Sequence, residues 1–256
     1  MKKILALLLI LSFFSSCKKS KNGEEIEAPE YSIVPKVKTI TSSGGSIVQS
    51  YTYDVTGRQI SWQLNNSSKT EHIYNGSSVI KIYSNPVTGS INGRDTLTLN
   101  AKGLVEKSTN YQNPGLMEMY EYNKDRLITK FSSTLNGSFT GEEKYYYTNN
   151  VLDSSVYFNN AGSRISIIKY TNYNTAKAST LTNYNYGQYY LGRQSVYPYL
   201  RFEVFTVAQN RVTQYNDIDF LFDAAGRMTR QYDSRTQVNV GLPTVTITST
   251  TDMMYY

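Results

Sequence analysis

Residues 51–58 read YTYDVTGR, and residues 220–227 read FLFDAAGR. Each stretch carries aromatic or apolar residues at alternate positions and then an aspartate, a glycine and an arginine at one fixed spacing. Alternation with a period of two is typical of a half-buried β-strand. Asp in the first position and Gly in the fourth favour a type I turn closed by a residue with positive φ. We therefore predict strands that end in tight hairpin turns.

The same turn pattern recurs along the chain. The residues that we assign to turns, with a structural role, are Asp54, Gly57, Arg58, Asn100, Gly103, Asp223, Gly226 and Arg227, and residues 159–162 repeat the pattern. The first turn residue moves from position 54 to 75, 100, 123 and 148, in steps of 21, 25, 23 and 25 residues. One repeat is therefore one hairpin of about 23 residues, which cannot bury its apolar face without neighbours.

Four dipeptides predict two-residue hairpin loops of type I′, which need positive φ at both loop residues. They are Asn75-Gly76, Asn92-Gly93, Asn136-Gly137 and Asn149-Asn150.

The composition also favours strands. The chain has 24 tyrosines among 256 residues, against one tryptophan and one histidine, and aromatic residues suit a pleated, half-buried surface. This length fits a single all-β domain. We predict an all-β antiparallel up-and-down meander of roughly a dozen or more strands that forms a strongly curled sheet or a partly open barrel, because wide sheets seldom stay flat. Helix should be almost absent beyond the N-terminal signal segment.

The N-terminus describes an export signal. In residues 1–17, MKKILALLLILSFFSSC, two lysines precede an apolar run that is too short for a permanent membrane span. Cys17, the only cysteine, resembles the lipobox cysteine of bacterial lipoproteins. The resemblance implies that residues 1–16 are a signal peptide and that Cys17 carries lipid, where more than one acyl chain makes a stable anchor. Residues 17–36 then form the lipidated cysteine and a flexible tether, and residues 37–256 form one domain.

Together, the aromatic-x-aromatic-Asp-x-x-Gly-Arg motif and the lipobox carry a family resemblance. The two motif copies look like the YD repeat of Rhs and teneurin-like proteins. Combined with the lipobox, they resemble uncharacterised bacterial lipoproteins that are described as having a porin-like fold. The resemblance implies a YD-repeat-like β domain over residues 37–256, located in the cell envelope as an outer-membrane lipoprotein, on either its periplasmic or its surface side.

No residue constellation predicts catalysis, a cofactor or a metal. A formal charge of +6, spread along the chain, is too weak for a nucleic-acid footprint. His72 is the only histidine and lacks the further ligands or positioned partner of a metal or base site, so we interpret it as a strand residue. Adjacent acids, Glu24 with Glu25 and Glu142 with Glu143, would point to opposite faces of a strand. We expect a non-catalytic protein.

The most promising binding residues lie where the repeat pattern lapses. Tyrosine offers rigid contact area and a hydroxyl group, and the candidate ligand-binding residues are Tyr184, Tyr186, Tyr189, Tyr190, Tyr197 and Tyr199. We expect a monomer that is held to a membrane by its N-terminal lipid and that binds a carbohydrate or a protein. An integral outer-membrane β-barrel and an envelope enzyme without a recognisable motif are the alternatives.

Overall fold

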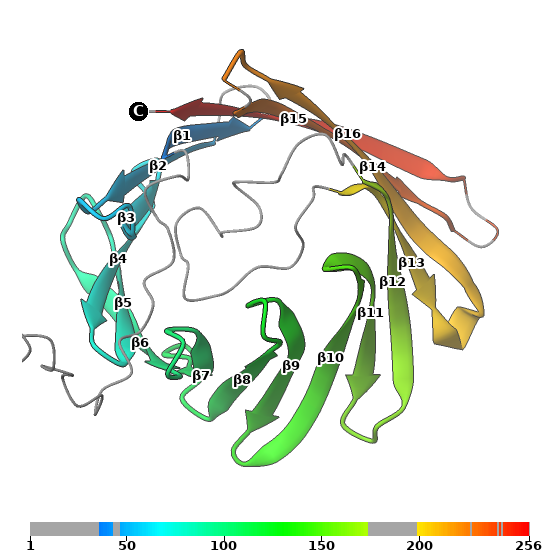
Figure 1. Ribbon diagram of the computed structural model, residues 1–256, viewed down its shortest axis with the longest axis horizontal. Helices are drawn as coiled ribbons and strands as arrows, with labels where there is room; N and C mark the ends of the chain where they lie inside the picture. The colour runs from blue at the N-terminus through cyan, green and yellow to red at the C-terminus, as the bar shows by residue number, and fades with distance from the viewer. Residues whose placement is uncertain are drawn as a thin grey trace, which may run out of the picture.

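The computed structural model describes residues 36–42, 47–173, 199–225, 227–239, 241 and 243–255, which form sixteen strands arranged around a barrel (Figure 1). The strands are β1 (Val37–Ser42), β2 (Val48–Tyr53), β3 (Gln59–Leu64), β4 (Ser68–Asn75), β5 (Ser78–Ser84), β6 (Ile91–Leu99), β7 (Val105–Thr109), β8 (Leu116–Tyr122), β9 (Ile128–Leu135), β10 (Ser138–Thr148), β11 (Val151–Asn159), β12 (Arg164–Tyr173), β13 (Tyr199–Thr206), β14 (Arg211–Phe222), β15 (Met228–Gln237) and β16 (Val245–Tyr255). The described residues contain one short 3₁₀ turn, η5 (Val207–Gln209), and among them no helix is long and apolar enough to cross a membrane.

The barrel closes through its first and last strands. Every strand pairs antiparallel with the next one in the sequence, and β1 also pairs with β16, from Val37 opposite Tyr255 to Ser42 opposite Thr251. The all-β antiparallel meander is therefore confirmed, and the barrel is closed rather than partly open. Closure gives every described strand two partners, so no edge strand is left to pair with another chain.

Strand register assigns the side chains to two faces. Tyr51 lies opposite Trp62, Trp62 opposite Thr70, and Thr70 opposite Tyr83, and directly opposed residues share a face of the sheet. This face is the more buried one, with Tyr51 only 4% exposed. Because the concave side of a closed barrel is more enclosed than its convex side, we assign this face to the lumen.

An apolar cluster lies on the lumen face beside the seam where the barrel closes. Ile40, Tyr51, Met228 and Met253 come from β1, β2, β15 and β16 and are all buried, with Tyr53, Trp62, Phe220 and Phe222 packed against them. Full burial of a side chain of this size contributes roughly 1.5–3 kcal/mol. The first and last strands are thus joined by side-chain burial as well as by backbone hydrogen bonds.

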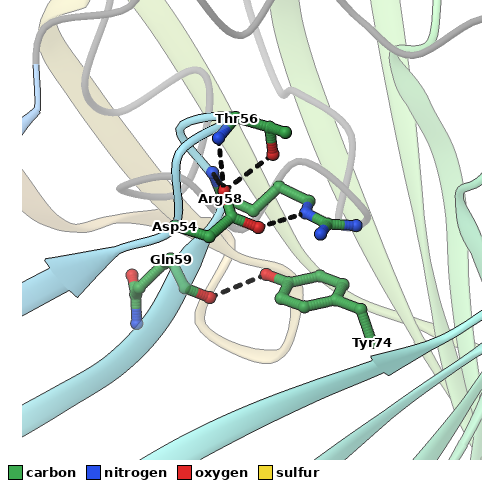
Figure 2. A network of polar contacts seen from close by, with 5 residues as sticks. All are labelled: Asp54, Thr56, Arg58, Gln59 and Tyr74. Atoms are coloured by element: carbon green, nitrogen blue, oxygen red, sulfur yellow. Dashed lines mark hydrogen bonds and ion pairs between the residues drawn. The ribbon is translucent and has the colours of Figure 1, made fainter.

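Five turns share one bonding pattern, in which an Asp or Asn side chain accepts hydrogen bonds from the turn that it opens. In Figure 2, Asp54 Oδ1 accepts from the Thr56 N–H (2.9 Å), the Thr56 hydroxyl (2.7 Å) and the Arg58 N–H (2.9 Å). Its Oδ2 accepts from Arg58 Nε at 2.7 Å, and Gly57 has φ 90°. Partial burial raises the pKa of the Asp54 carboxyl, but hydrogen bonds from Thr56 and Arg58 outweigh burial and leave this pKa below its ordinary value.

The other four turns repeat this arrangement. The side chains of Asn100, Asn123, Asn159 and Asp223 each accept from the backbone N–H four residues later, at 2.9–3.1 Å. Around all five turns, the strand pairing slips by one residue beside the turn, which is the β-bulge that accompanies a three-residue hairpin loop. At the fourth position, where Gly57, Gly103 and Gly162 have positive φ, Arg126 takes the same conformation with φ 63°.

The predicted two-residue loops have three different outcomes. Both residues of Asn136-Gly137 and of Asn149-Asn150 have positive φ, so these two type I′ predictions are confirmed. The β4–β5 loop is shifted by one residue, because Asn75 still pairs with Ser78 and the loop consists of residues 76–77. Only Gly76 has positive φ there, which corresponds to a loop with glycine first rather than a type I′ turn.

The loop predicted at Asn92-Gly93 is wrong, because both residues lie within β6. A Cβ atom at Gly93 would lie 1.7 Å from Cδ2 of Tyr111, whose ring lies 4.9 Å from that of Tyr83. Glycine is needed at this position for the close approach of an aromatic ring. The chain reverses earlier, over residues 85–90, where Gly89 has φ 72°.

Candidate functional site

The tyrosines that we selected from the sequence fall almost entirely outside the described residues. Tyr184, Tyr186, Tyr189, Tyr190 and Tyr197 lie there, and Tyr199 is the first residue of β13, where its backbone pairs with Tyr173 of β12. Among the described residues, a set of charged and hydroxyl groups lies together on the lumen face of β4–β8. We call it the lumen cluster: His72, Lys81, Tyr83, Asp95, Ser108, Tyr111, Glu118 and Tyr120.

Lys81 of β5 lies at the centre of the lumen cluster. Its position is opposite His72 on one side and Asp95 on the other. Burial lowers the pKa of the Lys81 ammonium, while the charges of Asp95 and Glu118 counteract part of that effect. A lysine near two carboxylates keeps its charge at a lower desolvation penalty than an isolated one.

The two carboxylates are held by separate sets of donors. Asp95 accepts from the Tyr83 hydroxyl (2.6 Å) and from the Tyr111 backbone N–H (2.7 Å). Glu118 accepts from the Ser108 hydroxyl (2.7 Å) and the Tyr120 hydroxyl (2.9 Å). Burial, and then the neighbouring carboxylates, raise the pKa of both tyrosines, so that they remain hydroxyl donors. The arrangement therefore fixes both carboxylates rather than leaving either one open to a reactant.

His72 lies in β4, as the sequence predicted, and its side chain is only 5% exposed. Burial, and then the positive charge of Lys81, lower the pKa of His72 to about 3. Histidine is therefore neutral at neutral pH and is not poised to exchange a proton there.

The acidic pair Glu142 and Glu143 divides between the two faces, as expected for neighbours in a strand. Glu142 forms an ion pair with Lys144 at 2.8 Å, and Glu143 accepts from the Tyr145 hydroxyl at 2.8 Å. Nor does the described part of the chain bring three or more His, Cys, Asp or Glu side chains together as metal ligands. These positions support neither a pair of catalytic carboxylates nor a metal centre.

A groove lined by polar residues and by Ile60, Ile73 and Ile82 crosses the outer wall over β2–β5. Its volume is about 590 Å³, and its lining includes Ser50, Thr52, Ser61, Gln63, Lys69 and Glu71. The Thr52 and Ser61 hydroxyls are hydrogen-bonded at 2.6 Å, and Lys69 pairs with Glu71 at 2.7 Å. Hydroxyl, amide and charged groups on one shallow surface can donate and accept hydrogen bonds from a polar ligand. We call this feature the wall groove.

Sequence reasoning missed both features. In SVIKIYS, residues 78–84, alternation alone assigns the isoleucines on either side of Lys81 to the buried face, but register places Val79, Lys81 and Tyr83 on the lumen face. The sequence did contain a signal for the lumen cluster, because some acidic residues lie two positions before a tyrosine and therefore share its face of the strand. Examples are Glu118 with Tyr120 and Glu143 with Tyr145.

Comparison with known proteins supports the fold. No family model matches the chain, and no curated protein matches it. Among solved structures, a porin-like protein from Bacteroides uniformis ATCC 8492 is similar, with a TM-score of 0.63 and 15% identity over 87% of this chain and 98% of that one. A porin-like protein from Bacteroides vulgatus ATCC 8482 has a TM-score of 0.54 and 15% identity, covering 87% of this chain and 99% of that one. The fold is porin-like. The comparisons lend no support to the YD-repeat assignment.

The neutral, buried His72 predicts that stability depends on pH. An unfolded histidine binds a proton near pH 6.5, whereas the folded one does so only near pH 3. Between these values the unfolded state binds more protons, so the free energy of unfolding falls as the pH falls, by up to about 1.4 kcal/mol per pH unit.

Urea unfolding at about pH 7 and about pH 5 should show this loss in the native chain and a smaller loss in His72→Gln. Parallel losses in the two proteins would contradict a buried, neutral His72.

Proposed function

We propose that the chain is a monomeric, lipid-anchored module of the cell envelope, whose barrel folds in water and binds a carbohydrate or protein ligand without catalysis. The observation that carries the proposal is the charged outer wall of the barrel. Ion pairs on this wall join Lys69 to Glu71, Lys130 to Glu121, Lys144 to Glu142, Arg201 to Glu203 and Asp217, and Arg230 to Asp252.

These ion pairs argue against lipid around the barrel. In a transmembrane barrel the outward face is an apolar band, and a Lys or Arg at its midplane costs roughly 2–4 kcal/mol. The pairs here lie on strands around most of the circumference, from β4 to β16. Strand length is a second argument against a transmembrane barrel. A membrane-crossing strand needs about 9–11 residues, whereas β7 has 5 and β1, β2 and β3 have 6 each.

The lumen also argues against a conducting pore. Porin lumens are polar and filled with water, whereas Tyr51, Trp62 and Phe220 lie in the apolar cluster on the lumen face beside the seam. A porin-like fold is thus combined with a barrel whose inner face beside the seam is used for packing. This combination favours a structural or binding module.

The anchor is proposed from the sequence. The basic start, the apolar run and Cys17 after two serines support lipidation at Cys17, and lipidation would hold a water-folded barrel at the outer membrane. The five turns of one geometry support a repeated hairpin unit, and on this basis we retain the YD-repeat relationship as a proposal.

The wall groove supports a polar ligand. Sugars present many hydroxyl groups, and the groove offers the Gln63 amide, two serine hydroxyls and the Lys69–Glu71 ion pair. The described residues of the groove can therefore make several hydrogen bonds at once, which gives orientation and specificity.

Replacing Cys17 tests the anchor and the water-folded barrel together. In Cys17→Ser the barrel should leave the membrane fraction and remain a folded, β-rich monomer in detergent-free buffer, as measured by fractionation, circular dichroism and light scattering. Retention in the membrane after alkaline washing, or aggregation without detergent, would contradict the proposal.

A glycan array probed with the purified barrel tests the ligand. We expect Lys69→Gln/Glu71→Gln to weaken binding about tenfold, or about 1.4 kcal/mol. The matched control, Lys144→Gln/Glu142→Gln, removes an equivalent outer-wall pair on β10 and should leave binding unchanged. An equal effect of both variants would exclude the wall groove. Sensitivity to Tyr189→Ala and Tyr197→Ala alone would place the site in the tyrosine segment, and absence of binding would remove the carbohydrate ligand.

A further inference from the structure

The meander places alternate turns at opposite ends of the barrel. The chain enters β1 at Val37 and leaves β16 at Tyr255, and these two residues are paired. The end where they lie also carries the turns that follow the even-numbered strands; we call it the tether end. The turns that follow the odd-numbered strands lie at the far end.

The two ends differ in charge. Turn residues at the far end, over 65–67, 85–90, 110–115, 136–137, 160–163 and 207–210, include no Asp, Glu, Lys or Arg. The turns described at the tether end carry Arg58, Lys102, Lys124, Arg126 and Arg227 against Asp54, Asp125 and Asp223. Lys36 adds another positive charge directly before β1. Arg164 and Arg211 begin strands at the far end, where Arg211 is bonded to Gln209 and to the Val238 carbonyl.

Three of the tether-end cations lie together. Arg58 and Arg227 pair with the aspartates of their own turns at 2.7 Å. Lys102 and Lys124, by contrast, are exposed at the tips of neighbouring turns. Arg126 connects these turns, because its Nη1 donates to the Lys102 carbonyl oxygen at 2.9 Å. We call Lys102, Lys124 and Arg126 the cationic rim.

The backbone of Arg126 supports a role for the cationic rim. Arg126 has φ 63°, at the position where the equivalent turns have Gly57, Gly103 and Gly162. A side chain in this left-handed region is less favourable than glycine there. Arg126 therefore occupies a position where the backbone conformation favours glycine.

We propose that the tether end docks onto the anionic phospholipid headgroups of the membrane in which the chain is anchored. The inference rests on the proposed function for the anchor at Cys17. Cys17 lies 19 positions before Lys36, a span that reaches at most about 65 Å when extended. This reach alone would allow either end of the barrel to face the bilayer, so the charge difference between the ends selects the orientation.

The energetic scale is sufficient for such a selection. Each Lys or Arg held near an anionic surface strengthens partitioning about fivefold, equivalent to about 1 kcal/mol. Lys102 and Lys124 together thus contribute about 25-fold. The interaction decays over a Debye length, which is about 10 Å at 0.1 M salt and about 3 Å at 1 M.

The test uses the lipidated full chain in vesicles. Cys17 is the only native cysteine, and acylation blocks it, so one introduced cysteine can be labelled selectively. Ala101→Cys and Ala161→Cys place a fluorescent donor in equivalent turns at the tether and far ends, respectively. Energy transfer to a headgroup acceptor is then measured in phosphatidylcholine vesicles and in mixtures with phosphatidylglycerol.

In anionic vesicles we expect stronger transfer from position 101 than from position 161. Strands β6 and β11, with 9 residues each, span roughly 30 Å between the two ends of the barrel. The difference should disappear at about 1 M salt and in Lys102→Gln/Lys124→Gln. The control Arg94→Gln/Lys169→Gln removes the same charge from exposed mid-strand positions. In this control the difference in transfer between positions 101 and 161 should remain. Equal transfer from both ends, or a difference that survives loss of the two lysines, would overturn the proposal.

Failure of the anchor gives a different result. A chain that does not float with vesicles of either composition at high salt contradicts lipidation at Cys17. Docking is then tested with the same chain by co-sedimentation with anionic vesicles at low salt, where Lys102→Gln/Lys124→Gln should weaken binding about 25-fold. Unchanged co-sedimentation would overturn docking by itself.

Discussion

The pairing of β1 with β16 is the constraint on which the rest of the structure depends. Without it, the sheet would expose two edges and the apolar cluster of Ile40, Tyr51, Met228 and Met253 would be split between them. Closure also makes the two faces of the sheet unequal. Tyr51, Trp62 and Phe220 lie with the lumen cluster on the enclosed face, whereas the ion pairs between strand residues lie on the outer wall.

Local chemistry made part of this fold predictable. The turns opened by Asp54, Asn100, Asn159 and Asp223 depend on residues within five positions of one another, so their pattern is visible in the sequence. The β6 region shows the limit of such reasoning. Asn92-Gly93 has the sequence of a hairpin loop, but Gly93 serves to admit the ring of Tyr111, a contact across 18 positions that no local pattern contains.

The candidate site shows the same limit more sharply. Lys81 stands between two isoleucines and would face solvent in a sheet with an apolar interior. The structure instead places Lys81 on the lumen face, opposite Asp95 and His72, because register is set by the whole meander. Nor could the difference in charge between the two ends be read from net charge. It emerges only when strand order assigns each turn to an end.

The proposed function requires that the outer wall of this porin-like barrel faces water, even when the protein is attached to a membrane. Spin labels at Ile73→Cys and Tyr146→Cys, two outer-wall positions that are 49% and 46% exposed, test it most directly in the lipidated, vesicle-bound chain. For a wall that faces water, we expect frequent collisions with a water-soluble nickel chelate and few with oxygen dissolved in the bilayer. Protection from the chelate with strong relaxation by oxygen at both positions would show instead that lipid surrounds the barrel, and would overturn the proposed function.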